Sequence, residues 1–340
     1  MQIVTQERTN ARKCSPGPPF RCPYPLRVHR GVVPAALVVV AVTAAAAAAL
    51  PAPGGAGTGE PTAVGAPVLT LRRTPALLAR PLGHARLRQA LHRFLASDPG
   101  PSCLLVTSAD GVVFEHHADR PLSAASGMKL LTAAAALHAI GERGSVPYPD
   151  GGDAAAGDIV AHMLRESDNA AAEALLRAVG RQAAGEATVE AGRRAVPDVL
   201  TAARLPVAGV RVVDGSGLDR ANRATCRILH AVVDRASDDG PIGRGLPVAG
   251  ESGTLATRFT ELSGLVRAKT GWIRDVATLA GLIYTPGGRL AFAYISNGAV
   301  TPSAGASLQD ELVAALAELP AVVGYEVLGP AGHPAAPDPP

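Results

Sequence analysis

The 340-residue sequence is poor in aromatic side chains and in lysine. Phe, Trp and Tyr together make up 3% of the chain, so a folded core must be filled mainly by Ala, Val and Leu. Only three of the 32 basic residues are lysines, at positions Lys13, Lys129 and Lys269, and the other 29 are arginines. Arginine stays protonated in proteins, whereas a lysine amine can lose its proton and act as a base. The lysines are therefore candidates for chemistry that the arginines cannot perform.

The chain also lacks the charge and the ligand patterns of several classes of protein. The net charge of +3 divides into +5 in residues 1–30 and −2 in the remainder, which leaves no basic body to bind nucleic acid. No Cys-x-x-Cys motif occurs and the nine histidines show no metal-ligand spacing, so we expect no metal and no other cofactor. Cys103 and Cys226 lie in apolar segments. They can pair in an oxidising compartment, but two buried free thiols are the expected case.

The first part of the chain is typical of a protein sent across a membrane. Residues 1–30 are predicted to form a basic cytoplasmic N-terminus, and residues 31–50, with 19 apolar or small residues from Val32 to Leu50, a transmembrane anchor or signal sequence. The 30 residues before the apolar run are long for a signal peptide and favour an anchor, but a small-residue site near Ala49 or Ala52 leaves cleavage as the alternative. Residues 51–77 are rich in Pro, Gly and Ala, which indicates a flexible linker. We expect the body of the protein on the extracytoplasmic face of the membrane, anchored or secreted.

Hydrophobic periodicity predicts an α+β domain over residues 78–325, followed by a disordered tail over residues 326–340. The two ends of the domain are predicted to form one antiparallel sheet flanked by helices, and the middle, about residues 126–262, an all-helical lobe. The predicted helices cover 81–96, 126–140, 158–164, 170–179, 186–203, 225–236 and 304–319, the predicted strands cover 103–107, 112–115, 264–270, 276–285 and 289–296, and a loop covers 141–157.

Ser126 and Lys129 stand at the start of an apolar predicted helix. Positions i and i+3 of a helix share a face, so the hydroxyl and the amine can come within hydrogen-bond reach. A serine hydroxyl is a poor nucleophile until a base takes its proton. A neutral lysine can be that base if burial or a second positive charge lowers its pKa. The pattern therefore predicts a serine nucleophile with a lysine base, beside backbone N–H groups suited to an oxyanion.

Two further motifs follow in the order that this chemistry requires. Ser167-Asp168-Asn169 interrupts a helical region, and Lys269-Thr270-Gly271 ends a predicted strand. Each motif alone is weak evidence, because the first is common at helix caps and the second at ordinary strand ends. The ordered set of three motifs is typical of class A β-lactamases and penicillin-binding proteins.

The sequence resembles the penicillin-recognising serine enzymes. More closely, it resembles the D-alanyl-D-alanine carboxypeptidase/endopeptidase family of the penicillin-binding protein 4 (DacB) type, over about residues 78–319. This likeness implies the β-lactamase/penicillin-binding-protein (transpeptidase-like) fold. Full-length members of that family carry large accessory domains between the first two motifs, where this chain has a short interval, so a compact form is implied. The other segments that carry the likeness are 121–133, 213–218, 252–255 and 279–281.

The resemblance implies a serine-type D-Ala-D-Ala carboxypeptidase that acts on peptidoglycan stem peptides and is inhibited covalently by β-lactams. Ser126 would attack the carbonyl of the penultimate D-Ala, with Lys129 as the base. Ser167 would relay a proton to the leaving amine. Asn169 would hold Lys129 and the substrate amide.

The third motif is expected to bind the substrate. By resemblance, Lys269 and Thr270 would hold the terminal carboxylate beside Gly271, and Lys269 would lower the pKa of Lys129 by like-charge repulsion. The backbone N–H groups of Ser126 and Trp272 would hold the oxyanion. Trp272 stands where the family usually has a small or hydroxylic residue, so its indole is expected to crowd or reshape the substrate groove.

Three neighbouring residues have plainer interpretations. Asp168 is expected to cap a helix, Ser216 to stabilise its Gly-flanked turn, and Glu166 to be a solvated charge at a helix end.

Two other functions remain open. A β-lactamase needs a glutamate on a loop after Ser-Asp-Asn, and residues 196–210 contain none. A degenerate receptor that binds penicillin or peptidoglycan without turnover is compatible with Trp272 and with the missing accessory domains.

Overall fold

The computed structural model describes residues 74–148, 151–298 and 301–319, with side chains from Pro81 onward. The predicted N-terminus, the segment 31–50 and the tail 326–340 lie outside these ranges, as does all of the predicted linker except its last four residues, which are helical. Among the described residues, no helix combines the length and the apolar character needed to cross a membrane.

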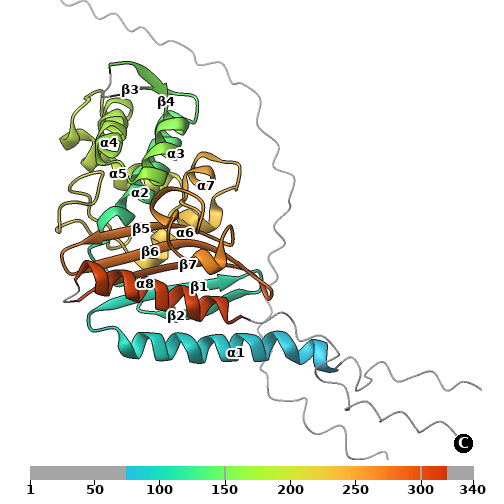
Figure 1. Cartoon of the computed structure of the whole chain (residues 1–340). Coiled ribbons are helices and arrows are strands. Elements are labelled where there is room, and N and C mark those ends of the chain that lie inside the picture. The colour runs from blue at the N-terminus through green and yellow to red at the C-terminus, as the bar shows by residue number, and fades with distance from the viewer. Residues whose placement is uncertain (1–73, 149–150, 299–300, 320–340) are drawn as a thin grey trace, which may run out of the picture. The chain divides into compact units, whose positions relative to one another are not determined.

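A five-stranded antiparallel sheet joins the two ends of the domain, in the order β2-β1-β7-β6-β5 (Figure 1). The first two strands form the predicted hairpin, and the last three form a meander. Pairing of β1 with β7 brings the two sets into one sheet, which confirms the predicted arrangement. The strands are β1 (Ser102–Ser108), β2 (Gly111–His116), β5 (Val266–Ile273), β6 (Val276–Thr285) and β7 (Gly288–Asn297).

The edge strand β5 is longer than predicted. Trp272 and Ile273 still pair with Ala277 and Val276 of β6, so the strand continues to the tight turn at Asp275. The motif Lys269-Thr270-Gly271 therefore lies inside an edge strand, not at its end.

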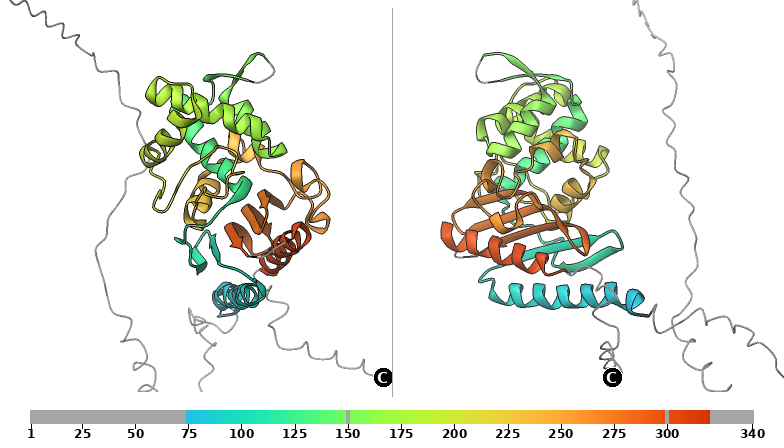
Figure 2. Two further views of the ribbon diagram at one scale, coloured as in Figure 1. Left: turned by 90° about the vertical axis from the view of Figure 1, so that its left-hand side faces the viewer. Right: turned by 45° about the vertical axis from the view of Figure 1, so that its right-hand side comes forward.

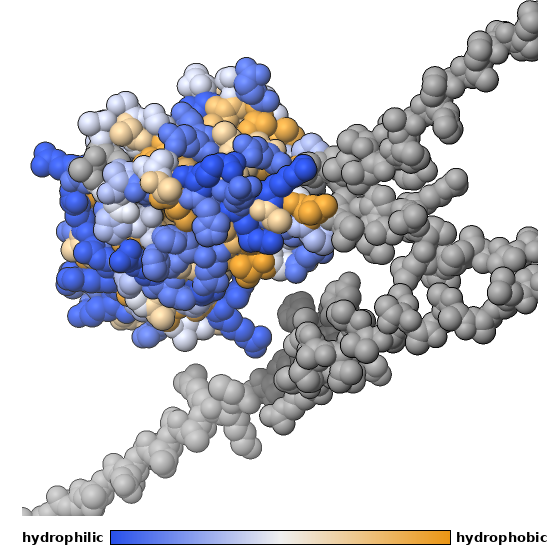
Figure 3. All heavy atoms as spheres, turned by 90° about the horizontal axis from the view of Figure 1, so that it is seen from below, coloured by the Kyte–Doolittle hydropathy of each residue, from blue (hydrophilic) through white to orange (hydrophobic). Residues whose placement is uncertain are grey.

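Helices cover both faces of the sheet (Figure 2). α1 (Thr74–Ser97) and α8 (Pro302–Ala317) contact each other and the strands on one face, while α6 (Cys226–Arg235) contacts β1, β6 and β7 on the other. α1 buries Leu87 and Leu91, whose spacing follows the helical repeat, and presents arginines to solvent. The face on the α1 side is accordingly mostly hydrophilic, with hydrophobic residues in small scattered groups (Figure 3).

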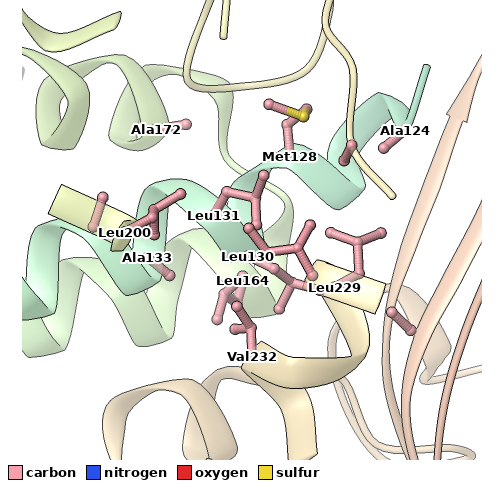
Figure 4. Close-up of a cluster of buried hydrophobic side chains, with 14 of the residues drawn as sticks. Ala124, Met128, Leu130, Leu131, Ala133, Leu164, Ala172, Leu200, Leu229 and Val232 are labelled. Atoms are coloured by element: carbon pink, nitrogen blue, oxygen red, sulfur yellow. The ribbon is translucent and has the colours of Figure 1, made fainter. Parts of the chain in front are cut away.

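The helical lobe is built around α2 (Met128–Ile140), which follows a 3₁₀ turn, η1 (Ala125–Gly127). Leu130 and Leu131 of α2 pack in a cluster of buried side chains contributed by several other helices (Figure 4). A helix that is apolar on nearly all sides must be buried, and α2 holds this central position. The remaining helices of the lobe are α3 (Ala156–Glu166), α4 (Asn169–Ala184), α5 (Val189–Ala202) and the short α7 (Pro241–Gly245).

The predicted loop 141–157 contains a small hairpin of β3 (Ser145–Pro147) and β4 (Asp153–Ala155). Strands of three residues are too short to show an alternating hydrophobic pattern. A helix as short as α7 is likewise too short to show the helical repeat of apolar residues.

Cys103 and Cys226 form a disulfide bond, so the expectation of two free thiols is wrong. Cys103 lies on β1 and Cys226 is the first residue of α6, and their Cα atoms are 5.9 Å apart. The sequence places the two cysteines on a strand and a helix, but it does not show that α6 packs over β1.

Candidate active site

Ser126 lies in η1, at the entrance to α2, and its side chain is half-buried. The turn is tight: the preceding Ala125 has φ 46°, a left-handed conformation that is uncommon for alanine and often found at functional sites. A loop packs directly on this turn, because a Cβ atom on Gly217 (φ 86°) would lie 1.8 Å from the carbonyl oxygen of Ala125. Only glycine fits there.

The buried amine of Lys129 meets three oxygen atoms. Its Nζ lies 3.1 Å from Ser126 Oγ, 2.7 Å from Asn169 Oδ1 and 2.7 Å from the carbonyl oxygen of Ser216. A neutral amine has two N–H donors and one lone pair. If the donors serve the two carbonyl oxygens of Asn169 and Ser216, the lone pair faces the hydroxyl of Ser126. Neutral Lys129 is thus placed to accept the proton of Ser126.

Burial lowers the pKa of Lys129 to about 8, against the opposing effect of the carboxylates of Asp214, Glu173 and Asp168. We expected repulsion by Lys269 to be the cause. Repulsion between the two ammonium groups acts instead, after burial, to lower the pKa of Lys269 to about 7.

The second and third motifs meet across the site. Ser167, with φ 58°, forms the break between α3 and α4, and its Oγ accepts a hydrogen bond of 3.0 Å from Lys269 Nζ. The same ammonium donates to the carbonyl oxygen of Thr270 at 2.6 Å. The structure therefore brings together residues from the three motifs, Ser126, Lys129, Ser167, Asn169 and Lys269.

Asp168, between the two polar residues of its motif, caps α4. Its Oδ1 accepts hydrogen bonds from the N–H groups of Ala170 and Ala171, so the predicted cap is confirmed. Its Oδ2 also binds the hydroxyl of Tyr148 and the ring of His162. Glu166 is exposed, as expected.

Gly271 allows the edge strand to approach η1. A Cβ atom at this position would lie 3.0 Å from both the carbonyl oxygen of Ala124 and the nitrogen of Gly127. The N–H of Ala268 donates outward to Pro247, so the N–H of Trp272, four residues on, faces the same outer edge of β5. It lies one residue beyond the contact with η1.

Thr270 and Trp272 lie on the same face of the strand, opposite to the face of Gly271. Thr270 Oγ1 lies 2.8 Å from Thr254 Oγ1. The indole of Trp272 is 43% exposed, packs against Gly305 of α8 and borders a cavity of about 250 Å³. The indole therefore lies on the α8 side of β5, while Gly271 faces η1 on the other side.

The sequence did not assign the loop 213–222 to the site. Asp214 accepts hydrogen bonds from the N–H groups of Gly217 and Asp219, at 2.5 and 2.7 Å, and from buried Asn222. Ser216 Oγ donates to Asp214, as expected of a residue that stabilises its turn, but its carbonyl oxygen also binds Lys129. The glycines beside Ser216 indicate a turn in the sequence. The contact of its backbone carbonyl with Lys129 could not be predicted, because every residue has such a carbonyl.

A metal site is not apparent in the part of the chain that the structure describes, since no three His, Cys, Asp or Glu side chains are placed to share an ion.

Comparison with models of protein families shows which family the chain belongs to. The model of the D-Ala-D-Ala carboxypeptidase 3 (S13) family matches residues 101–146 and 155–319, more than half of the sequence. The chain belongs to this family. The match includes all three motifs and the loop that carries Ser216.

Curated relatives of this carboxypeptidase family are longer than the region they share with the chain. It is 37% identical over 174 residues to a D-alanyl-D-alanine carboxypeptidase from an Actinomadura species, which covers 47% of the chain and 32% of the relative. It is 36% identical over 149 residues to the carboxypeptidase DacB of Mycolicibacterium smegmatis, covering 40% and 32%. The chain thus spans about a third of the length of these relatives.

Solved structures confirm the predicted fold. Penicillin-binding protein 4 (dacB) from Haemophilus influenzae superposes with a TM-score of 0.57 at 14% identity, covering 69% of this chain and 99% of that one. A β-lactamase from Chitinophaga pinensis gives a TM-score of 0.52 at 16% identity, covering 68% and 98%.

Proposed function

We propose that the protein is a serine-type D-Ala-D-Ala carboxypeptidase that acts on peptidoglycan stem peptides through an acyl-enzyme on Ser126. The observation that carries the proposal is the Lys129 amine, 3.1 Å from Ser126 Oγ, with two carbonyl oxygens placed to occupy its N–H donors. Membership of the family supports the substrate class, because it is named for cleavage at D-Ala-D-Ala.

In the acylation step, Lys129 takes the proton of Ser126, and Ser126 Oγ forms a bond to the carbonyl carbon of the penultimate D-Ala. The N–H groups of Ser126 and Trp272 stabilise the oxyanion, and one such donor contributes about 3 kcal/mol to lowering the barrier. The C–N bond then breaks, and Ser167, held by Lys269, relays to the amine of the departing D-Ala the proton that Lys129 took, so that Lys129 and Ser167 both return to their starting protonation states.

Water completes the cycle by hydrolysing the ester on Ser126. Lys269 and Thr270 would hold the terminal carboxylate of the stem peptide, and the buried amine of Lys269 donates a hydrogen bond to the carbonyl oxygen of Thr270. A β-lactam would enter the same acylation step and remain bound through its opened ring.

Release of D-Ala tests this proposal against its two alternatives. Full-length protein is incubated with a peptide that ends in D-Ala-D-Ala, and free D-Ala is counted per molecule of protein. A carboxypeptidase releases many equivalents, and the Ser126→Ala variant releases none. A receptor stops at one equivalent or fewer, and a β-lactamase hydrolyses many equivalents of penicillin while sparing the peptide.

We also propose that the catalytic domain lies outside the cytoplasm, attached through residues 31–50 or released by cleavage after them. The basic lead and apolar run support this placement, and so does the Cys103–Cys226 bond, because disulfides persist in oxidising compartments. Protease added to intact cells with a permeabilised wall should digest the domain while a cytoplasmic control stays intact. Equal protection of both would contradict this location.

A further inference from the structure

Helix α4 interacts with the amine of Lys129 in two ways, directly through Asn169 and indirectly through Glu173 and the loop that carries Ser216. Asn169, its first residue, accepts a hydrogen bond from Lys129 directly. Glu173 lies one turn further on the same face of the helix. Its Oε1 accepts hydrogen bonds from the N–H groups of Gly215 and Ser216, at 2.9 and 3.0 Å. The carbonyl oxygen of that same Ser216 accepts from Lys129 Nζ at 2.7 Å.

We propose that Glu173 is a positioning residue for the base. Its carboxylate accepts hydrogen bonds from the backbone of Gly215 and Ser216 and so holds the Ser216 carbonyl oxygen within hydrogen-bond distance of the Lys129 amine. In this arrangement the lone pair of the neutral amine faces Ser126. The role of the base rests on the proposed function, whereas the contact between Glu173 and the Ser216 loop does not. Glu173 touches no substrate and acts through the loop.

Asp214, an acid within the loop, makes different contacts from those of Glu173. Asp214 binds the N–H groups of Gly217 and Asp219, which lie beyond Ser216, and therefore shapes the turn. Glu173 is the acid that accepts from the N–H of Ser216 itself. Without an acceptor the N–H groups of these two buried residues would each lose a hydrogen bond, and the loop could relax away from Lys129.

Because Glu173 is charged, the proposal predicts the direction in which the pKa of Lys129 shifts when that charge is removed. Four charged groups interact with Lys129: Asp168 at the N-cap of α4, Glu173 on α4, Asp214 in the loop, and Lys269 on β5. The carboxylates raise the pKa of Lys129, against the larger effect of burial. Removing the charge of Glu173 should therefore lower the pKa of Lys129 and make the amine neutral at lower pH.

The scarcity of lysine makes this pKa directly measurable. Full-length protein labelled with carbon-13 at the lysine Cε gives three signals, one for each lysine of the chain. The Lys129→Arg variant identifies the signal of Lys129. Titration of this signal then reports the protonation of the base without reference to any activity.

Glu173→Gln is the central variant, because the amide keeps one oxygen to accept both N–H groups and loses the charge. We expect the pKa of Lys129 to fall by about half a unit to one unit, within the range of effects of a nearby opposite charge. The rate of penicillin acylation at high pH should stay near that of the wild type. Glu166→Gln is the matched control, since exposed Glu166 ends α3 next to the same motif, and the pKa of Lys129 should not change.

Glu173→Ala removes the acceptor as well. We expect its acylation rate at high pH to fall about 10- to 100-fold, because a misplaced base loses alignment with Ser126. Circular dichroism checks the fold, and the Glu173→Gln variant tests the proposal even if the alanine variant unfolds. An unchanged Lys129 pKa in Glu173→Gln, or wild-type acylation by folded Glu173→Ala, would overturn the inference.

The outcome separates this inference from the proposed function. A wild-type protein that penicillin does not acylate would contradict the carboxypeptidase, while a shifted Lys129 signal in Glu173→Gln would still support the placement of Glu173. Normal acylation of the wild type with no effect of either Glu173 variant would contradict the inference alone.

Discussion

The pKa of Lys129, the proposed base, is set by two opposing influences on one buried amine. Burial favours the neutral form that can accept a proton, while three carboxylates favour the ammonium. The sequence pointed to Lys129 as a candidate base because the motif Ser-x-x-Lys is made of side chains. It did not identify the cause of the pKa shift, which depends on how deeply the folded chain buries the amine.

The rate of penicillin acylation should therefore rise with pH through about 8. Below this pH Lys129 carries a third proton, its lone pair is occupied, and Ser126 has no base. Lys129→Arg should abolish acylation at every pH, because arginine does not give up its proton. Rates measured by intact mass across this pH range test both statements, with circular dichroism to check the fold. A flat profile, or acylation of the arginine variant, would remove Lys129 as the base.

Trp272 should contribute its backbone and not its indole to acylation. The indole packs on the α8 side of β5, so Trp272→Thr should acylate at a rate near that of the wild type. Trp272→Pro deletes the N–H and should slow acylation by about 10²–10³-fold if one oxyanion donor is lost.

Folding of both Trp272 variants must be verified, since proline can distort a strand. If the threonine variant is as slow as the proline variant while both are folded, the indole itself is required. A binding function that uses Trp272 as a platform would then be favoured over the peptidase.

At the scale of elements, the break between α3 and α4 places Ser167 and Asn169 on either side of a helix cap. The cap could be predicted, because Asp directly before a helix has a known local function. Long strands such as β6 and β7 could also be predicted, because they are apolar and partly β-branched and turn residues separate them. The hairpin of β3 and β4 could not, since tertiary contacts decide such short pieces.

Loss of the cap should destabilise the helical lobe. Asp168→Ala should lower the free energy of unfolding by about 1 kcal/mol, whereas Asp168→Asn should lose much less, because asparagine caps equally well. Urea unfolding of the two variants beside the wild type measures the difference. Equal loss in both would mean that the charge of Asp168, through its contacts with Tyr148 and His162, matters more than the cap.

At the scale of the whole domain, the fold joins distant parts of the chain that the sequence describes only separately. The sheet pairs β1 with β7, and the bond between Cys103 and Cys226 closes a separation of 123 residues. Local patterns predicted the elements and the motifs of the site, because each depends on near neighbours. They could not predict which helix crosses which strand, and so they gave the wrong state for the two thiols.

Removing the disulfide should cost about 2–5 kcal/mol of stability, because the open chain gains conformational freedom when it unfolds. A Cys103→Ser, Cys226→Ser double variant compared with the wild type in urea unfolding measures this loss, and reductant should then affect only the wild type. Peptide mapping without reduction should recover the two cysteines as one linked species. Recovery as two separate thiol peptides would contradict the bond.

The central claim is that Ser126 is the nucleophile, and intact-mass analysis with penicillin tests it most directly. Wild-type protein should gain the mass of one penicillin, and Ser126→Ala should gain none. Ser123→Ala is the matched control and should still be labelled, because Ser123 lies three residues away and its buried Oγ has no hydrogen-bond partner among the residues that the structure describes. An adduct that persists in folded Ser126→Ala, or a folded wild type that gains no adduct, would contradict the account.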